Sequence, residues 1–132
     1  YIAREGEQVR ISGPSLRLQP KAAETLSLAI HELATNAVKY GALSHPNGQI
    51  HISWHLDDTV DPLELVFDWR EKGGPHVKPS QRKGFGTEVL ERTLAFELKG
   101  RTSLTFNPAG LQFQIALPLS RSFLQSGASN NR

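Results

Sequence analysis

The sequence predicts one α+β domain built as a two-layer sandwich, with helices packed on one face of a mixed β-sheet. Three observations lead to this fold class. The chain has 132 residues, which suits a single domain. Apolar residues alternate at every second position in several short segments and recur at helical spacing in two longer ones. The sequence lacks the strictly alternating strand and helix units that a doubly wound parallel sheet requires.

The N-terminal part of the sequence predicts two short strands followed by a helix. Residues 8–11 and 15–18 alternate loosely around a Gly-Pro turn pair, which indicates two strands with a tight connection. From Pro20 the apolar residues recur at spacings of three and four. Pro20 favours a helix start, and we expect Gly41 in the left-handed conformation just past the helix end.

The remainder predicts four more strands and a second helix. Residues 50–56 and 63–70 alternate between apolar and polar side chains, as half-buried strands do. Residues 87–98 return to helical spacing, and 102–106 and 111–117 form a hairpin around an Asn-Pro-Ala-Gly turn. We expect strands that are neighbours in sequence to pair, with both helices on one face of the sheet.

Composition excludes several classes of function. Lys and Arg number 15 and Asp and Glu 13, a net charge of +2 that gives no case for nucleic-acid or membrane binding. The chain has no Cys, so it has no disulfides, thiolate zinc sites or Cys nucleophiles. Lack of Cys suits a reducing compartment, and we expect a cytoplasmic location. The absence of Met, even at Tyr1, indicates a piece of a longer protein.

The domain is expected to cover residues 1–120. Residues 121–132 are rich in Ser, Asn and Gly, which predicts a disordered tail.

The first predicted helix carries polar residues beside its apolar stripe. Glu32, Asn36, Lys39 and Tyr40 follow one another at helical spacing, with His31 at the edge of this set. A carboxylate, an amide and an ammonium in line suit a hydrated Mg²⁺ and a phosphate tail, since Mg²⁺ takes few protein oxygens. The alternative is an ordinary solvated helix face. Spacing alone leaves both interpretations open.

A long glycine-rich loop precedes the second helix. Residues 72–86 hold four Gly and two Pro and show no periodicity, and long loops of this kind are usually functional. At its end, a Gly-Phe-Gly run leads directly into the helix, where backbone N–H groups form an anion site. The loop matches neither a Walker A motif nor a dinucleotide fingerprint. The residues of interest are Gly73, Gly74, Lys83, Gly84, Phe85, Gly86 and Thr87.

Two carboxylates stand at the end of the strand predicted over 63–70. Side chains alternate across a strand, so Glu71 falls on the face of Phe67 and Trp69, while Asp68 falls on the other. A carboxylate on the apolar face needs a hydrogen-bond donor, such as the exocyclic amino group of a purine. Parity therefore favours Glu71 as a ligand-binding residue, with Trp69 as a core aromatic.

Three segments together resemble a known family. Residues 31–43 (HELATNAVKYGAL) resemble the N box of the GHKL ATPase superfamily, 69–75 (WREKGGP) the W-x-E form of its G1 box, and 84–87 (GFGT) its G2 box. A His in the N box together with W-x-E is the mark of HWE-type sensor histidine kinases. The resemblance covers nearly all of residues 1–120 and implies the Bergerat ATP-binding fold.

The resemblance also implies roles for individual residues. Asn36 would coordinate Mg²⁺, Glu32 would orient a metal-bound water or polarise the reacting group, and Glu71 would accept the adenine amino group. His31 is grouped with the catalytic residues of the N box but is not the expected phosphorylated residue. Pro75 stands where the family has a second glycine. The implied catalytic set is Glu32, Lys39 and His31, and the nucleotide-binding set is Asn36, Tyr40, Glu71, Gly73, Gly74, Lys83, Gly84, Phe85, Gly86 and Thr87.

The activity implied by the resemblance is transfer of the γ-phosphoryl group of Mg-ATP to a histidine. In this family the acceptor lies on a separate dimerisation domain, and the phosphoryl group passes on to a response regulator. Two alternatives remain: a non-catalytic nucleotide-binding module that regulates a partner, and a protein-serine kinase of the anti-sigma type.

Overall fold

The computed structural model describes residues 8–75 and 87–119, except the side chains of 87–90. Its elements follow one another in an order close to the expected one. In chain order they are β1 (Val9–Ser12), α1 (Pro20–Lys39), the 3₁₀ turn η1 (Ala42–Ser44), β2 (Gln49–Asp57), β3 (Glu64–Lys72), α3 (Thr87–Leu98), β4 (Arg101–Asn107) and β5 (Gly110–Pro118).

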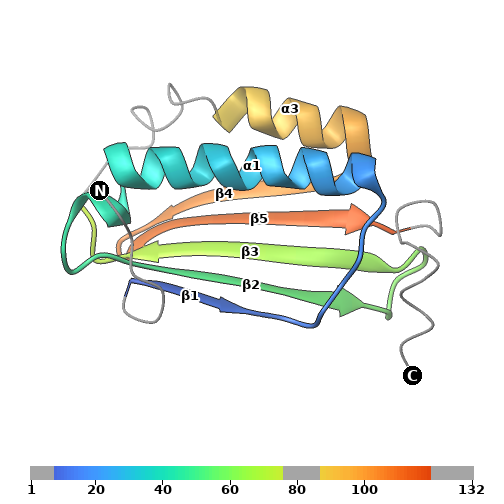
Figure 1. Cartoon of the computed structure of the whole chain (residues 1–132), viewed down its shortest axis with the longest axis horizontal. Helices are drawn as coiled ribbons and strands as arrows, with labels where there is room; N and C mark the ends of the chain where they lie inside the picture. Colours follow the sequence, from blue (N-terminus) through green and yellow to red (C-terminus); the bar gives the residue numbers. More distant parts are fainter. Residues whose placement is uncertain (1–7, 76–86, 120–132) are drawn as a thin grey trace.

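The strands form one five-stranded mixed sheet in the order β1-β2-β3-β5-β4. β1 pairs with β2 in parallel, and every other pairing within this sheet is antiparallel. Figure 1 shows α1 and α3 side by side on one face of the sheet. The fold is therefore the predicted α+β two-layer sandwich with a mixed sheet.

The core lies between the helices and the sheet. Along β3 and β5 every second residue is buried, so one face of each strand points toward the helices. Trp69 and Phe113, which are cross-strand partners, are among the largest fully buried side chains. Ala29 and Leu33 face them from the inner stripe of α1 and are completely buried. The prediction that Trp69 is a core aromatic is confirmed.

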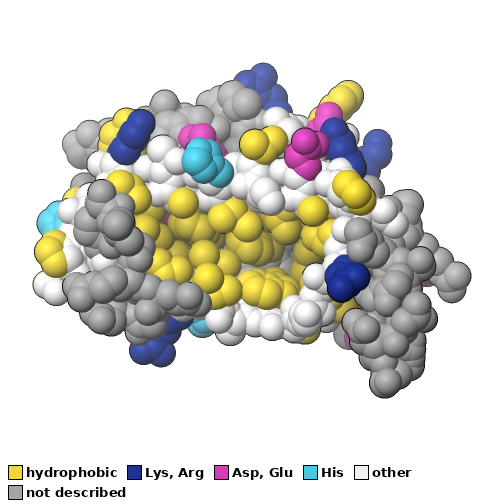
Figure 2. Space-filling model, viewed as in Figure 1, with side chains coloured by type: hydrophobic (Ala, Val, Ile, Leu, Met, Phe, Trp, Pro, Cys, Tyr) yellow, Lys and Arg dark blue, Asp and Glu magenta, His cyan; other side chains and the backbone are white. Residues whose placement is uncertain are grey.

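Apolar residues are also found beside α1. Figure 2 shows hydrophobic side chains gathered on the sheet next to the helix. Val9, Leu26, Ile30 and Trp54 are partly buried and pack against the core. The helix layer thus leaves part of the apolar sheet face open in this view.

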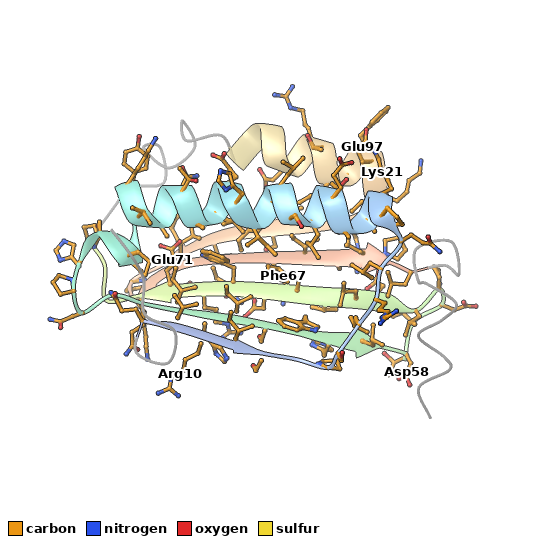
Figure 3. The ribbon with its side chains drawn as sticks, in the orientation of Figure 1. Arg10, Lys21, Asp58, Phe67, Glu71 and Glu97 are labelled. Atoms are coloured by element: carbon orange, nitrogen blue, oxygen red, sulfur yellow. The ribbon has the colours of Figure 1, made fainter. Side chains whose placement is uncertain are left out.

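Salt bridges connect elements at the end of the sandwich away from Tyr40. Lys21 at the start of α1 lies 2.5 Å from Glu97 near the end of α3, and both are labelled in Figure 3. The hydrogen bond and charge of Glu97 raise the pKa of Lys21. Because Lys21 is exposed, this bridge orients the two helices but contributes little free energy.

Three expectations about local structure are wrong. Residues 15–18 form no strand: only Leu18 makes an isolated bridge, and β1 pairs with β2 on the far side of α1 in the sequence. Strand neighbours in sequence do not always pair, since β3 lies beside β5. Gly41 has a φ of −115°, outside the left-handed region, because the helix already ends at Tyr40, which has a φ of −130° and a ψ of −15°.

No helix in residues 8–75 or 87–119 is both long enough and apolar enough to cross a membrane. The disordered tail predicted over 121–132 lies outside the described residues.

Candidate functional site

The predicted site residues converge at one end of the sandwich. There the end of α1 and the turn η1 meet the end of β3 and the turn between β4 and β5. Figure 3 shows Glu71 at this end, between α1 and the sheet. β3 continues through Lys72, two residues further than expected, and so carries Glu71 within the strand.

Glu71 is buried, with 5 % of its surface exposed, and two hydrogen bonds hold it. The backbone N–H of Ala42 donates to its Oε1 over 3.1 Å, and the indole Nε1–H of Trp69 donates to its Oε2 over 2.9 Å. A carboxylate has about four acceptor positions, and these two donors occupy one position on each oxygen. These bonds fix the carboxylate between the turn after α1 and the end of β3.

The prediction that Glu71 and Asp68 lie on opposite faces of β3 is confirmed. Asp68 lies on the opposite face of β3, where it accepts hydrogen bonds from Arg70 at 2.6 Å and Gln112 at 2.9 Å. It is part of the outer surface of the sheet. Of the two carboxylates, Glu71 is the one that faces the layer between the helices and the sheet.

Glycines let the backbone segments of this corner touch. Gly73 has a φ of +78°, the left-handed conformation that strains other residues. A Cβ on Gly74 would lie 2.7 Å from the Cα of Ala42, and one on Gly48 would lie 1.6 Å from the Ala42 carbonyl oxygen. Nothing in the sequence analysis indicated this contact of Gly48. Gly74 of the G1 segment therefore packs directly on the end of the N-box segment, and Gly73 packs on the loop that follows it, at Asn47.

The polar residues of α1 differ sharply in burial. Asn36 is 3 % exposed and lies in the inner stripe with Leu33, whereas Glu32 is half-buried. Lys39 and Tyr40 are exposed, the latter at 37 %. The interpretation as an ordinary solvated face is therefore wrong for Asn36. A buried amide in mid-helix is costly unless it is hydrogen-bonded, which makes Asn36 the unusual residue of the set.

His31 is exposed on α1, at the edge of the same set of residues as expected. Lys83, Gly84, Phe85 and Gly86 lie outside the described residues. The helix that was expected to follow them does begin at Thr87, whose side chain is not described.

Gln8 is a structural residue that sequence reasoning missed. It is buried, and its side-chain amide donates to the carbonyl oxygens of His45 and Gly48 at 3.2 Å each. Its own carbonyl accepts from the backbone N–H of Ile50 at 2.7 Å. The residue thus holds the loop that connects η1 to β2. Its place just before a short apolar strand gave no signal of this role.

The corner holds a small hollow of about 50 Å³, which is room for a few water molecules and not for a purine. It is lined by Gly41, Ala42, Glu71, Gly74 and residues 106–111, with Lys72 and Pro75 at its edge. Residues 8–75 and 91–119 therefore supply one wall of a ligand site and not a closed pocket.

These residues contain no group of three His, Asp or Glu side chains that could hold a metal by themselves. The side chains that could bind a metal ion each supply a single oxygen ligand, above all the amide of Asn36 and the carboxylate of Glu32. Such a set fits Mg²⁺ that is carried in by phosphate, because this ion keeps several waters and takes few protein ligands.

Comparison with known proteins gives relatives of one kind. The chain is 43 % identical over 122 residues to blue-light-activated histidine kinase 1 of Erythrobacter litoralis, and 39 % identical over 115 residues to a blue-light-activated histidine kinase of Brucella anthropi. These matches cover 90 % and 87 % of this chain. The chain spans only 32 % and 23 % of those two relatives. No family model matches the sequence.

Solved structures show the same fold. A blue-light-activated histidine kinase of Erythrobacter litoralis superposes with a TM-score of 0.66 at 17 % identity, covering 86 % of this chain and 36 % of that one. The catalytic domain of the histidine kinase ThkA superposes with a TM-score of 0.64 at 16 % identity, covering 84 % of this chain and 78 % of that domain. The chain is therefore similar in sequence to part of these histidine kinases and has the fold of solved histidine kinase catalytic domains, which agrees with the resemblance to the HWE type.

Proposed function

We propose that this domain binds Mg-ATP at the end of α1 and presents the γ-phosphoryl group to a histidine of a separate dimerisation domain. The observation that supports this most is the buried carboxylate of Glu71, fixed from two sides by Ala42 and Trp69. The Glu71 carboxylate is a hydrogen-bond acceptor held rigidly at the edge of an apolar layer, and this suits the amino group of adenine. A polar group of the ligand that met no partner at this position would cost free energy.

The residues of α1 suit the phosphate end of the nucleotide. Asn36 lies one helical turn before Tyr40 and supplies a hard oxygen for Mg²⁺, while exposed Lys39 supplies a mobile positive charge. Glu32 lies one turn further from the helix end and would orient a metal-bound water or the attacking imidazole. Bound Mg²⁺ would neutralise phosphate charge.

Gly73 and Gly74 suit the same site for a different reason. They let the G1 segment approach the turn after α1 without side chains between them. The five other proposed contacts, Lys83, Gly84, Phe85, Gly86 and Thr87, would come from the loop that leads into α3 and hold the phosphates with backbone N–H groups.

Phosphoryl transfer needs little covalent chemistry from the protein. Alignment and charge neutralisation supply most of the catalysis, so Asn36, Glu32 and Lys39 would act by position. The natural partners in this proposal are the phosphoacceptor domain and a response regulator. The related kinase ThkA has been solved in complex with a response regulator protein, which supports the second partner.

The test is nucleotide selectivity in Glu71→Gln. We expect the ATP affinity of this variant to fall about tenfold relative to its GTP affinity, because the amide both donates and accepts and offers one oxygen in place of two. Isothermal titration calorimetry with Mg²⁺ measures both affinities. Glu64→Gln, at the other end of β3 and paired with Arg101, is the matched control.

An unchanged ATP to GTP ratio in a folded Glu71→Gln domain would contradict the role of Glu71. Absence of any Mg-ATP binding to the unmodified domain would overturn the proposed function. Phosphorylation in trans of a histidine-bearing dimerisation domain distinguishes a kinase from a binding module.

A further inference from the structure

A second hollow lies at the same end of the sheet and reaches the face away from the helices. It has a volume of about 610 Å³, within the range of small-molecule sites. Its lining comes from all five strands and the β4–β5 turn. The basic or ionisable groups in this lining that point away from the helices are Arg10, His51, Arg70 and Lys72.

These side chains form a row set by the strand register. Arg10 pairs with His51, His51 with Arg70, and Arg70 with Gln112, so one residue from each of four adjacent strands stands in line. Adjacent strands lie about 4.8 Å apart, which puts the Cα atoms of Arg10 and Arg70 about 10 Å from each other. Lys72 and Gln49 are themselves partners in a neighbouring row at the sheet end.

The charged side chains at this end of the outer face are mostly positive. Among the residues that line the hollow, Glu71 alone carries a carboxylate, and that group lies on the inner face, bonded to Ala42 and Trp69. Arg10 makes no ion pair with any residue in 8–75 or 91–119. Figure 3 shows Arg10 at the same end of the sheet as Glu71, with the acidic Asp58 at the opposite end.

Arg70 is held in place beside the hollow. Its Nε donates to Asp68 at 2.6 Å, and Gln112 donates to the same carboxylate at 2.9 Å. The bond to Nε leaves the two terminal nitrogens of the guanidinium as the outer fork that recognises phosphate and carboxylate groups. Because Asp68 neutralises the charge of Arg70, the excess positive charge at the hollow comes from Arg10 and Lys72.

We propose that this hollow, which adjoins the corner hollow and shares residues 71–72, 107 and 109–111 with it, is a second anion site that takes a small ligand with two or more phosphate or carboxylate groups. Arg10 and Arg70 bind the two ends of the ligand, and the amides of Gln49 and Gln112 donate between them. Arg70 and Lys72 flank Glu71 on β3, so the ligand would contact the strand that carries the proposed adenine acceptor.

The test uses two probes, pyrophosphate and citrate, titrated without nucleotide or Mg²⁺ and followed by backbone amide chemical shifts. We expect shifts centred on 10, 51, 70 and 112 for at least one probe. Arg10→Gln, an exposed change on the edge strand, weakens binding about tenfold, and Arg10→Gln with Arg70→Gln abolishes it. Arg101→Gln, on the same face at the other end and paired with Glu64, leaves binding unchanged.

Preference between the probes identifies the ligand class: pyrophosphate alone indicates a phosphate ester, citrate alone a polycarboxylate. Three outcomes overturn the proposal. The first is that neither probe binds at millimolar concentration. The second is that Lys39→Gln loses probe binding while Arg10→Gln with Arg70→Gln keeps it. The third is that a hexaglutamate peptide binds much more tightly than either probe. The second would place the anion in the nucleotide site, and the third would make the surface a protein-binding one.

Discussion

The indole N–H of Trp69 donates a 2.9 Å hydrogen bond to Glu71, two residues further along the same strand. Both side chains are buried and point to the helix layer. The W-x-E motif is therefore a local hydrogen-bonded pair, in which the aromatic residue aims the carboxylate as well as filling the core. This pair gives the first prediction.

Trp69→Phe keeps an aromatic ring but removes the donor. We expect a loss of about 1–3 kcal/mol in the free energy of unfolding and a weaker preference for ATP over GTP, because Glu71 loses the hydrogen bond from the indole. Urea denaturation and nucleotide competition measure these effects. Trp54→Phe is the control, since its indole donates to the Pro14 carbonyl at an exposed position. Equal selectivity in both variants would show that Trp69 has only a packing role.

Gly74→Ala tests the backbone contact between the G1 segment and Ala42. The new Cβ would lie 2.7 Å from a backbone Cα, which cannot move by a side-chain rotation, so we expect about 1–3 kcal/mol of destabilisation and weaker nucleotide binding. Gly100→Ala meets only the end of the Leu117 side chain at 2.6 Å and should cost less. Thermal unfolding compares the two. A Gly100→Ala variant that is the less stable one would contradict this interpretation.

Asn36→Ala tests the metal ligand. In the unmodified domain ATP affinity should be higher with Mg²⁺ than with a chelator, and the variant should lose most of this difference. Asn47→Ala, in an exposed loop, should keep it. Calorimetry with and without Mg²⁺ measures the difference. A folded Asn36→Ala domain with the full Mg²⁺ effect would remove Asn36 from the metal site.

Asp57 gives a prediction about pH. The hydroxyl of Thr59 donates to Asp57 Oδ1 at 2.5 Å and its backbone N–H at 3.0 Å, and these bonds lower the pKa of Asp57 below the usual 3.8. The folded pKa is the lower one, so the contacts stabilise the fold at pH values above 3.8 and lose this effect as the pH falls through the folded pKa. Thr59→Val should raise the pKa of Asp57, which carboxyl ¹³C shifts can follow. An unchanged pKa would assign the shift to the backbone N–H alone.

The sequence predicts the fold well where one periodicity dominates. The helix over 20–39, the strands that became β2 to β5 and the inward position of Glu71 all follow from spacing. Residues 15–18 were misread because a loose alternation over four residues is too short to separate a strand from an extended connection. The parallel pairing of β1 with β2 depends on contacts across the whole of α1, which no local pattern reports.

The site was less predictable than the fold. Motif resemblance selected Glu71, Gly73 and Gly74, but the donors to the carboxylate are a backbone N–H and a core indole, neither of which has a sequence signal of its own. The burial of Asn36 could have been suspected only from its low helix propensity. Gln8 acts through carbonyl groups on a distant loop, so nothing near it in the sequence indicates its role.

The glycine contacts around Ala42 also determine how this end of the molecule can move. Where two segments meet through side chains, rotamer changes absorb small displacements. Here Gly48 and Gly74 bring backbone against backbone, and Gly110 does the same against the carbonyl of Glu71. The corner must therefore shift as one rigid block. Slow exchange of the Ala42 amide proton together with the β3 amide protons would be its signature, and any hinge that opens the site must lie elsewhere in the chain.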